Sequence, residues 1–143
     1  MWLPMCAAFE FKGRAAKPGK PVVAAGPKGP IRHVWAGFAR QEILSWWERK
    51  GAILIDVPAT RFAERSGITG KLIWDVVPSG LVIRGLIDHQ TPTPLIKIVT
   101  RQSSEVEFEN FQHPRMPVLE KALFQPVPDD LLPIDDMGDL FDL

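Results

Sequence analysis

The sequence has little of several features that define common classes of protein. It contains one cysteine in 143 residues, so it forms neither an internal disulfide nor a cysteine-based zinc cage. Its apolar runs are all shorter than the roughly 20 residues needed to cross a bilayer, and its first residues lack the basic-then-apolar order of a secretory signal. We therefore expect a cytoplasmic protein without a membrane partner.

The motifs of common enzyme classes are also missing. There is no Gly-rich phosphate loop, no dinucleotide fingerprint and no His-Glu-x-x-His helix. The three histidines are far apart in the sequence and have no clustered carboxylates beside them: His33, His89 and His113. The aspartates of residues 135–142 lack the ligand spacing of a calcium loop. We expect no metal and no cofactor.

Composition and turn residues predict the fold class. With 45% hydrophobic and 24% charged residues, the chain suits one compact domain, which we place at residues 1–125. Short apolar runs bounded by glycine and proline predict strands, and these lie at residues 21–25, 31–38, 52–57, 72–77, 81–87 and 95–100. The segments between them are too short for crossover helices. We expect a mostly β, α+β domain with a curved antiparallel or mixed sheet or a partial barrel.

Few helices are expected. Residues 41–49 predict a short helix, residues 60–65 a single helical turn, and residues 118–124 another short helix. Residues 12–30 are rich in lysine, glycine and proline and are predicted to form a loop around the strand at 21–25. Residues 126–143 are acidic and interrupted by prolines, and we expect them to form a flexible tail.

The net charge of zero hides an uneven distribution of charge. Residues 1–40 carry seven Lys or Arg and one acid, whereas residues 104–143 carry two basic residues and ten acids. A basic amino-terminal third can meet a polyanion, and an acidic end will repel a polyanion or occupy the same basic surface in its absence. The alternative is a soluble surface whose charge is merely uneven.

Three segments are similar, in the same order along the chain, to segments of a known protein family. Residues 5–9 read Met-Cys-Ala-Ala-Phe, residues 54–64 read Leu-Ile-Asp-Val-Pro-Ala-Thr-Arg-Phe-Ala-Glu, and residues 113–118 read His-Pro-Arg-Met-Pro-Val. They resemble the Met-Cys-Gly-Arg-Phe, Leu-Ile-Asn-Ala-Arg-Ala-Glu-Thr-Val-Ala-Glu and His-Asp-Arg-Met-Pro-Val segments of the SOS-response-associated peptidase family. Weaker likenesses to the same family lie at residues 20–23, 34–38, 45–47, 77–81 and 96–100.

The resemblance implies a covalent chemistry for Cys6. Members of this family attach to abasic sites in single-stranded DNA, where an α-amine condenses with the sugar aldehyde and the thiol of the same terminal cysteine closes a thiazolidine ring. An α-amine with a pKa of roughly 7.7–8.0 is partly neutral near pH 7. Because Cys6 follows five residues, we expect those residues to be removed, as the family's suspected self-processing would do. The alternative is that Cys6 is a small buried apolar residue at the start of a strand.

The resemblance also implies roles for His113 and Asp56. The corresponding histidine assists ring opening and proton transfer, which suits an imidazole pKa of about 6.5; a hydrogen-bonded histidine at a core edge is the alternative. Asp56 stands at the family's asparagine and is expected to position the terminal amine. Pro58 replaces the family's DNA-binding arginine, and its active-site glutamate falls on or near Ile83, so part of the family's polar machinery is missing.

Candidate DNA contacts come from basic and aromatic residues. Phosphates are expected to meet basic side chains and bases to stack on exposed indoles, and the candidates are Lys12, Arg14, Lys17, Lys20, Arg32, Trp35, Trp46 and Arg61. Adjacent Trp46 and Trp47 cannot both face one side of a helix, so at most one is expected to be exposed. Leu140 and Phe141 resemble the anchors of a peptide that docks on a replication clamp; a solubilising tail is the alternative.

Three functions remain open from the sequence. The first is capture of abasic sites in single-stranded DNA through a processed Cys6, in the nucleoid if the source is bacterial or a phage. The second is a catalytically impaired protein on the same scaffold that binds DNA or a replication partner. The third is an interaction protein unrelated to the family. A denaturation-resistant DNA adduct that depends on Cys6 separates the first from the other two.

Overall fold

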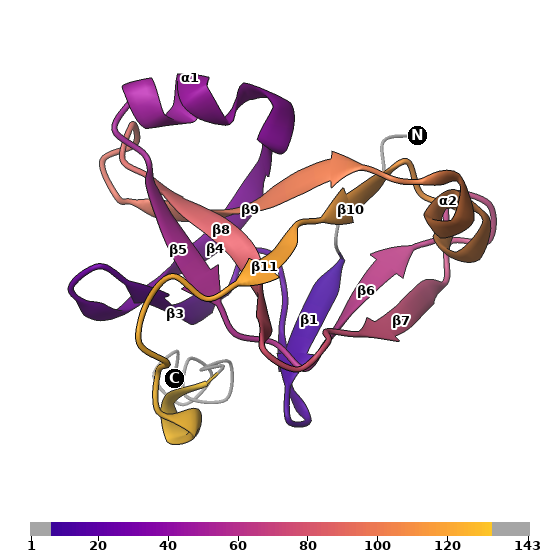
Figure 1. The fold of residues 1–143 in the computed structure, drawn as a ribbon, viewed down its shortest axis with the longest axis horizontal. Helices are drawn as coiled ribbons and strands as arrows, with labels where there is room; N and C mark the ends of the chain where they lie inside the picture. Colours follow the sequence, from indigo (N-terminus) through magenta and orange to yellow (C-terminus); the bar gives the residue numbers. More distant parts are fainter. Residues whose placement is uncertain (1–6, 133–143) are drawn as a thin grey trace.

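The computed structural model describes residues 7–132 of the chain. Within this range strands dominate, and two short α-helices and two 3-10 turns connect them (Figure 1). The strands are β1 Ala8–Phe11, β2 Arg14–Ala16, β3 Pro21–Gly26, β4 Gly29–Arg40, β5 Ile53–Val57, β6 Arg61–Arg65, β7 Leu72–Val76, β8 Leu81–Asp88, β9 Leu95–Gln102, β10 Arg115–Pro117 and β11 Leu119–Lys121. The helical elements are η1 Gln41–Ile43, α1 Leu44–Arg49, α2 Glu105–Phe111 and η2 Asp129–Leu131.

Five strands close into a small mixed barrel. Their order is β9-β4-β3-β5-β8, and the pairing of β8 with β9 completes the ring. The pairs are antiparallel except for the parallel pair β4–β9, and β10 and β11 extend the sheet from β9 and β8. Closure removes the exposed edges that an open sheet of these strands would present.

Alternating apolar residues explain why these strands enclose a core. Every second side chain of a strand points to one face, so Ile55 and Val57 of β5 and Ile96 and Ile98 of β9 all enter the same buried cluster. Gly85 of β8 pairs with Ile55 of β5 and Ile98 of β9, and a Cβ there would lie 3.0 Å from Val57 Cγ2 and 3.3 Å from the Lys97 carbonyl oxygen. A larger residue at position 85 would push the neighbouring strands apart.

A second, four-stranded antiparallel sheet packs against the barrel. Its order is β2-β1-β6-β7, and in Figure 1 it stands beside the barrel, with α2 above its far end. Phe9 of β1 and Phe62 of β6 join the core cluster of the barrel, and the Phe9 ring lies 5.0 Å from the Trp35 ring between centroids. The two sheets therefore share one hydrophobic core.

The predicted fold class is confirmed. The structure is mostly β with a closed barrel and few helices, strands form at each of the six predicted places, and η1 with α1 covers the predicted helix at 41–49. None of the described helices is long and apolar enough to span a membrane.

Two local predictions are wrong, and one helix was not predicted. Residues 60–65 form strand β6 rather than a helical turn, because pairing with β1 and β7 outweighs the local preference. Residues 118–124 supply β11 rather than a helix. Helix α2 was missed; its capping box joins Ser104 and Glu107, so a cap of the Ser-x-x-Glu type begins it.

The carboxyl-terminal part of the described chain also differs from expectation. Residues 126–132 do not extend away from the domain, because Val127 and Leu132 are buried against Val23 and Ala25 of β3. This packing corrects the expected flexible tail for its first seven residues. The predicted docking anchors Leu140 and Phe141 lie outside the described residues, as does Cys6.

Candidate active site

A buried acid and a buried histidine meet at the junction of the two sheets. Glu64 of β6 is 0% exposed and the His113 side chain is 2% exposed, and 3.9 Å separates Glu64 Oε2 from His113 Nδ1. Imidazole and carboxylate groups are the side chains most often used for proton transfer, and here one of each lies side by side in a buried place.

The local backbone explains why His113 turns inward. Helix α2 ends at Gln112, which adopts a left-handed conformation with φ 54° and ψ 39°, and Pro114 then prevents the helix from continuing. The Ser103 hydroxyl donates to the His113 carbonyl at 2.8 Å, and the Gly67 amide donates to the Gln112 carbonyl at 2.8 Å. These bonds fix the turn against β9 and against the loop that follows β6.

The imidazole has a partner for either state of its Nδ1 atom. Nδ1 lies 2.9 Å from the Arg115 carbonyl oxygen and 3.2 Å from the Arg115 amide nitrogen. A protonated Nδ1 donates to the carbonyl, and an unprotonated Nδ1 accepts from the amide. The Arg115 backbone therefore holds the orientation of the ring in either tautomer.

Strand β1 brings the amino-terminal end of the described chain to the same place. The Ala7 amide donates to the Ala63 carbonyl at 2.8 Å, and Ala8 is the register partner of Ala63. Ala63 directly precedes Glu64 in β6. Cys6 lies outside the described residues, but the residue that follows it in the sequence is hydrogen-bonded to β6 next to the buried acid.

Arg115 secures the segment that follows His113. Its guanidinium contacts both oxygens of Glu42, with NH1 2.7 Å from Oε2 and NH2 3.2 Å from Oε1, and NH2 also donates to the Thr100 carbonyl at 2.8 Å. The hydrogen bonds from Arg115 lower the pKa of the Glu42 carboxyl below its ordinary value. β10 is thereby tied to β9 and to η1.

A hollow of about 610 Å³ opens beside this segment. Pro114 and Arg115 line it on one side and α2 on the other, and Arg40, Ser103 and the exposed ring of Phe108 contribute to its wall. It provides a mixed polar and apolar surface within one residue of His113. Its lining also contains the carboxylates of Glu105 and Glu109.

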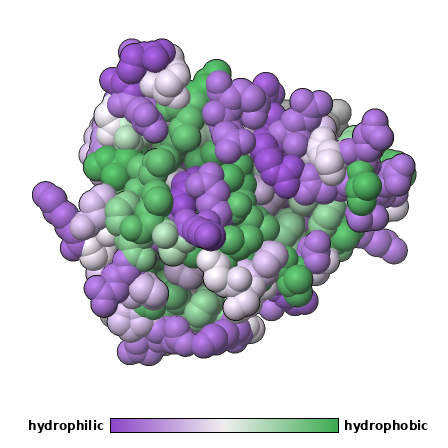
Figure 2. All heavy atoms as spheres, viewed as in Figure 1, coloured by the Kyte–Doolittle hydropathy of each residue, from purple (hydrophilic) through white to green (hydrophobic). Residues whose placement is uncertain are grey.

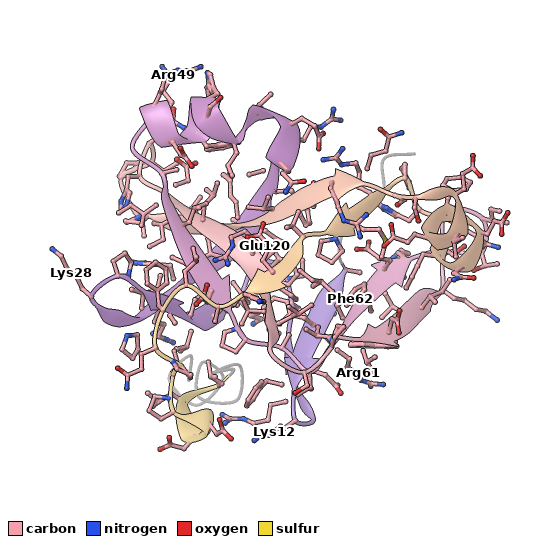
Figure 3. All side chains as sticks on the ribbon, viewed as in Figure 1. Lys12, Lys28, Arg49, Arg61, Phe62 and Glu120 are labelled. Atoms are coloured by element: carbon pink, nitrogen blue, oxygen red, sulfur yellow. The ribbon has the colours of Figure 1, made fainter. Side chains whose placement is uncertain are left out.

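Asp56 lies in a different cluster from His113. Its carboxylate pairs with Arg84 NH1 at 2.6 Å and accepts hydrogen bonds from the amides of Leu123 and Phe124, and the side chains of Asp56 and Arg84 are 2% and 1% exposed. Figure 2 shows a hydrophilic group near the centre of the view with hydrophobic atoms around it, in the region where Figure 3 labels Glu120. Glu120 pairs with Arg84 at 3.2 Å. These contacts join β5, β8 and the chain after β11, so the structure gives Asp56 a structural ion pair rather than a place beside the imidazole.

The predicted aromatic contacts divide into one buried and one exposed residue. Trp35 is 0% exposed and packs against Phe9 and Phe38, so the prediction that it stacks on a base is wrong. Trp46 is 38% exposed on α1, whereas Trp47 packs against a buried cluster of the barrel. This confirms that only one of the adjacent indoles is presented.

The predicted basic contacts do not form one surface with Trp46. Figure 3 places Arg49 of α1 and Lys12 of the β1–β2 turn at opposite ends of the molecule. Arg61 is held by both oxygens of Glu10 and covers the Trp74 ring at 4.3 Å. Among the remaining candidates, the side chains of Lys17, Lys20 and Arg32 are exposed. Lys12 and Arg14 contact Asp129 of η2.

Sequence reasoning missed Glu64. The signal was its alternation with Phe62, which places both side chains on the core face of a strand. Reading residues 60–65 as a helical turn hid this pattern.

Among residues 7–132, no three His, Cys, Asp or Glu side chains gather in a way that would hold a metal ion. No protein-family model, curated protein or solved structure matches the chain.

Proposed function

We propose that this protein binds single-stranded DNA and captures abasic sites covalently through Cys6, with His113 as the acid and base. The resemblance of residues 5–9 and 113–118 to the SOS-response-associated peptidase family suggests this chemistry. The observation that carries the proposal is the meeting of three distant parts of the chain, since Ala7, Glu64 and His113 converge at the junction of the sheets.

The proposed reaction uses two groups of one residue. Removal of residues 1–5 frees the α-amine of Cys6, which attacks the aldehyde of the ring-opened sugar and forms an imine with loss of water. The thiol then adds to the imine carbon, and its proton passes to the nitrogen, so that a thiazolidine closes. His113 takes and returns the protons of these steps, with the Glu64 carboxylate beside it.

The surroundings suit a nucleic-acid strand. The hollow beside His113 offers Arg40 for a phosphate and Phe108 for a base, and a bound strand would have to keep its phosphates away from Glu105 and Glu109 in the same lining. The β1–β2 turn, at the other end of β1, offers Lys12 and Arg14. Because an extended strand rises about 3.3 Å per residue, Lys12 lies about 17 Å along the chain from Ala7, and one bound strand can span both places.

The test is a single-stranded oligonucleotide with one abasic site, incubated with protein and resolved under denaturing conditions. A chain that begins at Cys6 should give a denaturation-resistant adduct, and Cys6→Ala should give none. A chain that retains residues 1–5 should not react until it is processed, and intact-mass analysis reports that processing. An equal adduct yield from Cys6→Ala would contradict the proposal.

The role of His113 is tested in the same assay. His113→Gln keeps a hydrogen-bonding side chain and is expected to slow adduct formation by about 10² or more, the usual contribution of a general acid or base. His89→Gln is the matched control, because His89 is exposed in the β8–β9 connection. Tryptophan fluorescence checks that both variants are folded. Equal rates for the two variants would remove His113 from the mechanism.

A second candidate function is reversible DNA binding without chemistry. It is favoured by the engagement of Asp56 with Arg84, which leaves the predicted positioning role of Asp56 without support. This candidate predicts salt-sensitive binding of intact single strands and no adduct from any form of the chain.

A further inference from the structure

The chain after β11 forms a strap across the outside of the barrel. We use this name for residues 122–132. Its beginning is fixed where the Leu123 and Phe124 amides donate to Asp56 at 2.9 Å, and its end is fixed where Val127 and Leu132 pack on Val23 and Ala25. The strap is therefore a packed element with both polar and apolar anchors.

The strap ends on the basic turn between β1 and β2. Lys12 and Gly13 both have positive φ, as a two-residue hairpin loop requires. Lys12 Nζ forms an ion pair with Asp129 Oδ2, and Arg14 NH1 lies 3.4 Å from the carbonyl oxygens of both Asp129 and Asp130. Figure 3 shows Lys12 beside the short helix at the end of the described chain.

The oxygen atoms that the strap presents to Lys12 and Arg14 resemble the phosphate oxygens of a nucleic-acid strand. A carboxylate and two carbonyl oxygens meet the same two cations that the proposed function assigns to phosphates. The Lys12 and Asp129 side chains are each 62% exposed, so solvent and salt weaken their attraction and a polyanion can compete for Lys12. Val127 and Leu132, in contrast, are buried against Val23 and Ala25, and this apolar packing favours the position of the strap over the turn.

We infer that the strap is an internal competitor that reduces the affinity of the β1–β2 turn for nucleic acid until a strand displaces Asp129. The inference deepens the proposed function, because it concerns regulation of the DNA contacts, but it does not require the Cys6 chemistry. The observed affinity equals the intrinsic affinity of the turn multiplied by the fraction of molecules in which the turn is uncovered.

The first test removes the ion pair without disturbing the fold. Asp129→Asn and Asp130→Asn change the net charge equally, but only Asp129 contributes its carboxylate to Lys12. Binding of a fluorescein-labelled oligothymidylate of 15 nucleotides is followed by anisotropy at low salt. Asp129→Asn should bind about two- to fivefold more tightly than Asp130→Asn, the range of an exposed ion pair. Adding Lys12→Gln to both variants should remove the difference.

The second test releases the strap itself. Val127→Asp places a charge at a buried anchor, whereas Leu131→Asp adds the same charge at an exposed position of the strap. Val127→Asp should expose the strap to chymotrypsin and should bind the oligonucleotide about tenfold more tightly than Leu131→Asp, the gain expected if about nine-tenths of molecules are covered. A strap that becomes protease-sensitive with unchanged affinity would overturn the inference.

The outcomes separate the inference from the proposed function. If the Asp129 effect is found but no abasic adduct forms, the inference stands and the covalent function fails. If Asp129→Asn and Asp130→Asn bind equally, the inference fails while adduct formation still tests the chemistry. If no variant binds the oligonucleotide, the DNA-binding role of the turn and its regulation both fail.

Discussion

Arg84 should be the most sensitive charged residue of the barrel. Arg84→Met keeps the length of an unbranched side chain and removes the guanidinium. In the native protein that group donates to the Ile55 carbonyl at 2.8 Å, to Asp56 Oδ1 at 2.6 Å and to the Lys121 carbonyl at 3.0 Å. The variant therefore leaves a buried carboxylate without its cation and removes the guanidinium hydrogen bonds to two carbonyls.

The expected loss of stability is large. Removing one partner of a buried ion pair costs about 3–5 kcal/mol, against a total of about 5–15 kcal/mol for a typical domain. With a urea m-value of about 2 kcal/mol per molar, the unfolding midpoint should fall by about 2 M. Tryptophan fluorescence reports the transition, because Trp35 is fully buried.

Two further variants make the test specific. Arg49→Met removes an exposed arginine of α1 and should change stability by less than about 0.5 kcal/mol. The double variant Asp56→Asn with Arg84→Met replaces the isolated anion by an amide that can still accept from the Leu123 and Phe124 amides. It should be more stable than Arg84→Met by at least about 1 kcal/mol. A double variant no more stable than the single one, or a loss below 1 kcal/mol for Arg84→Met, would refute the reasoning.

Three other substitutions test the assignments above. Hydrogen bonds from Arg101 lower the pKa of Glu107 to about 2 from its ordinary 4.5. Ionised Glu107 therefore stabilises the folded state above about pH 4.5, and this stabilisation is lost as the pH falls toward 2. In urea unfolding measured over this pH range, Glu107→Gln should show a smaller change of stability with pH than the native protein. Trp35→Ala should cost about 3–5 kcal/mol, because the indole is a core side chain, and a loss below 1 kcal/mol would contradict its burial. Trp46→Ala should change the free energy of unfolding by less than about 1 kcal/mol. If the exposed indole stacks on a base, the same variant should weaken oligonucleotide binding by about 1–3 kcal/mol. Unchanged affinity in anisotropy titrations would exclude that contact.

Predictions from the sequence succeeded where local pattern and global structure agree. Apolar runs ended by glycine or proline became strands, because such residues fit a pleated surface and its turns. They failed at residues 60–65 and 118–124, where helix-compatible residues gain more from pairing with a neighbouring strand than from a single helical turn.

The candidate site was only partly predictable. His113 was singled out by its sequence segment, but its neighbour Glu64 was not, because an acid with no expected strand around it carries no sign of burial. Asp56 was given a role beside the terminal amine, whereas it pairs with Arg84 in the register of β5 with β8. Which carboxylate faces the imidazole depends on strand pairing, which a single sequence does not specify.

The amino-acid sequence by itself determined the secondary-structure class, the absence of cysteine frameworks and known nucleotide motifs, and the opposite charges of the two ends, because each of these depends on composition or on neighbouring residues. Only the tertiary structure decided that Ala7 is hydrogen-bonded to Ala63, that the next residue, Glu64, lies 3.9 Å from His113, that Trp35 is core, and that Asp129 pairs with Lys12. These outcomes join residues tens of positions apart, and they are selected by the packing of one shared core rather than by any local preference.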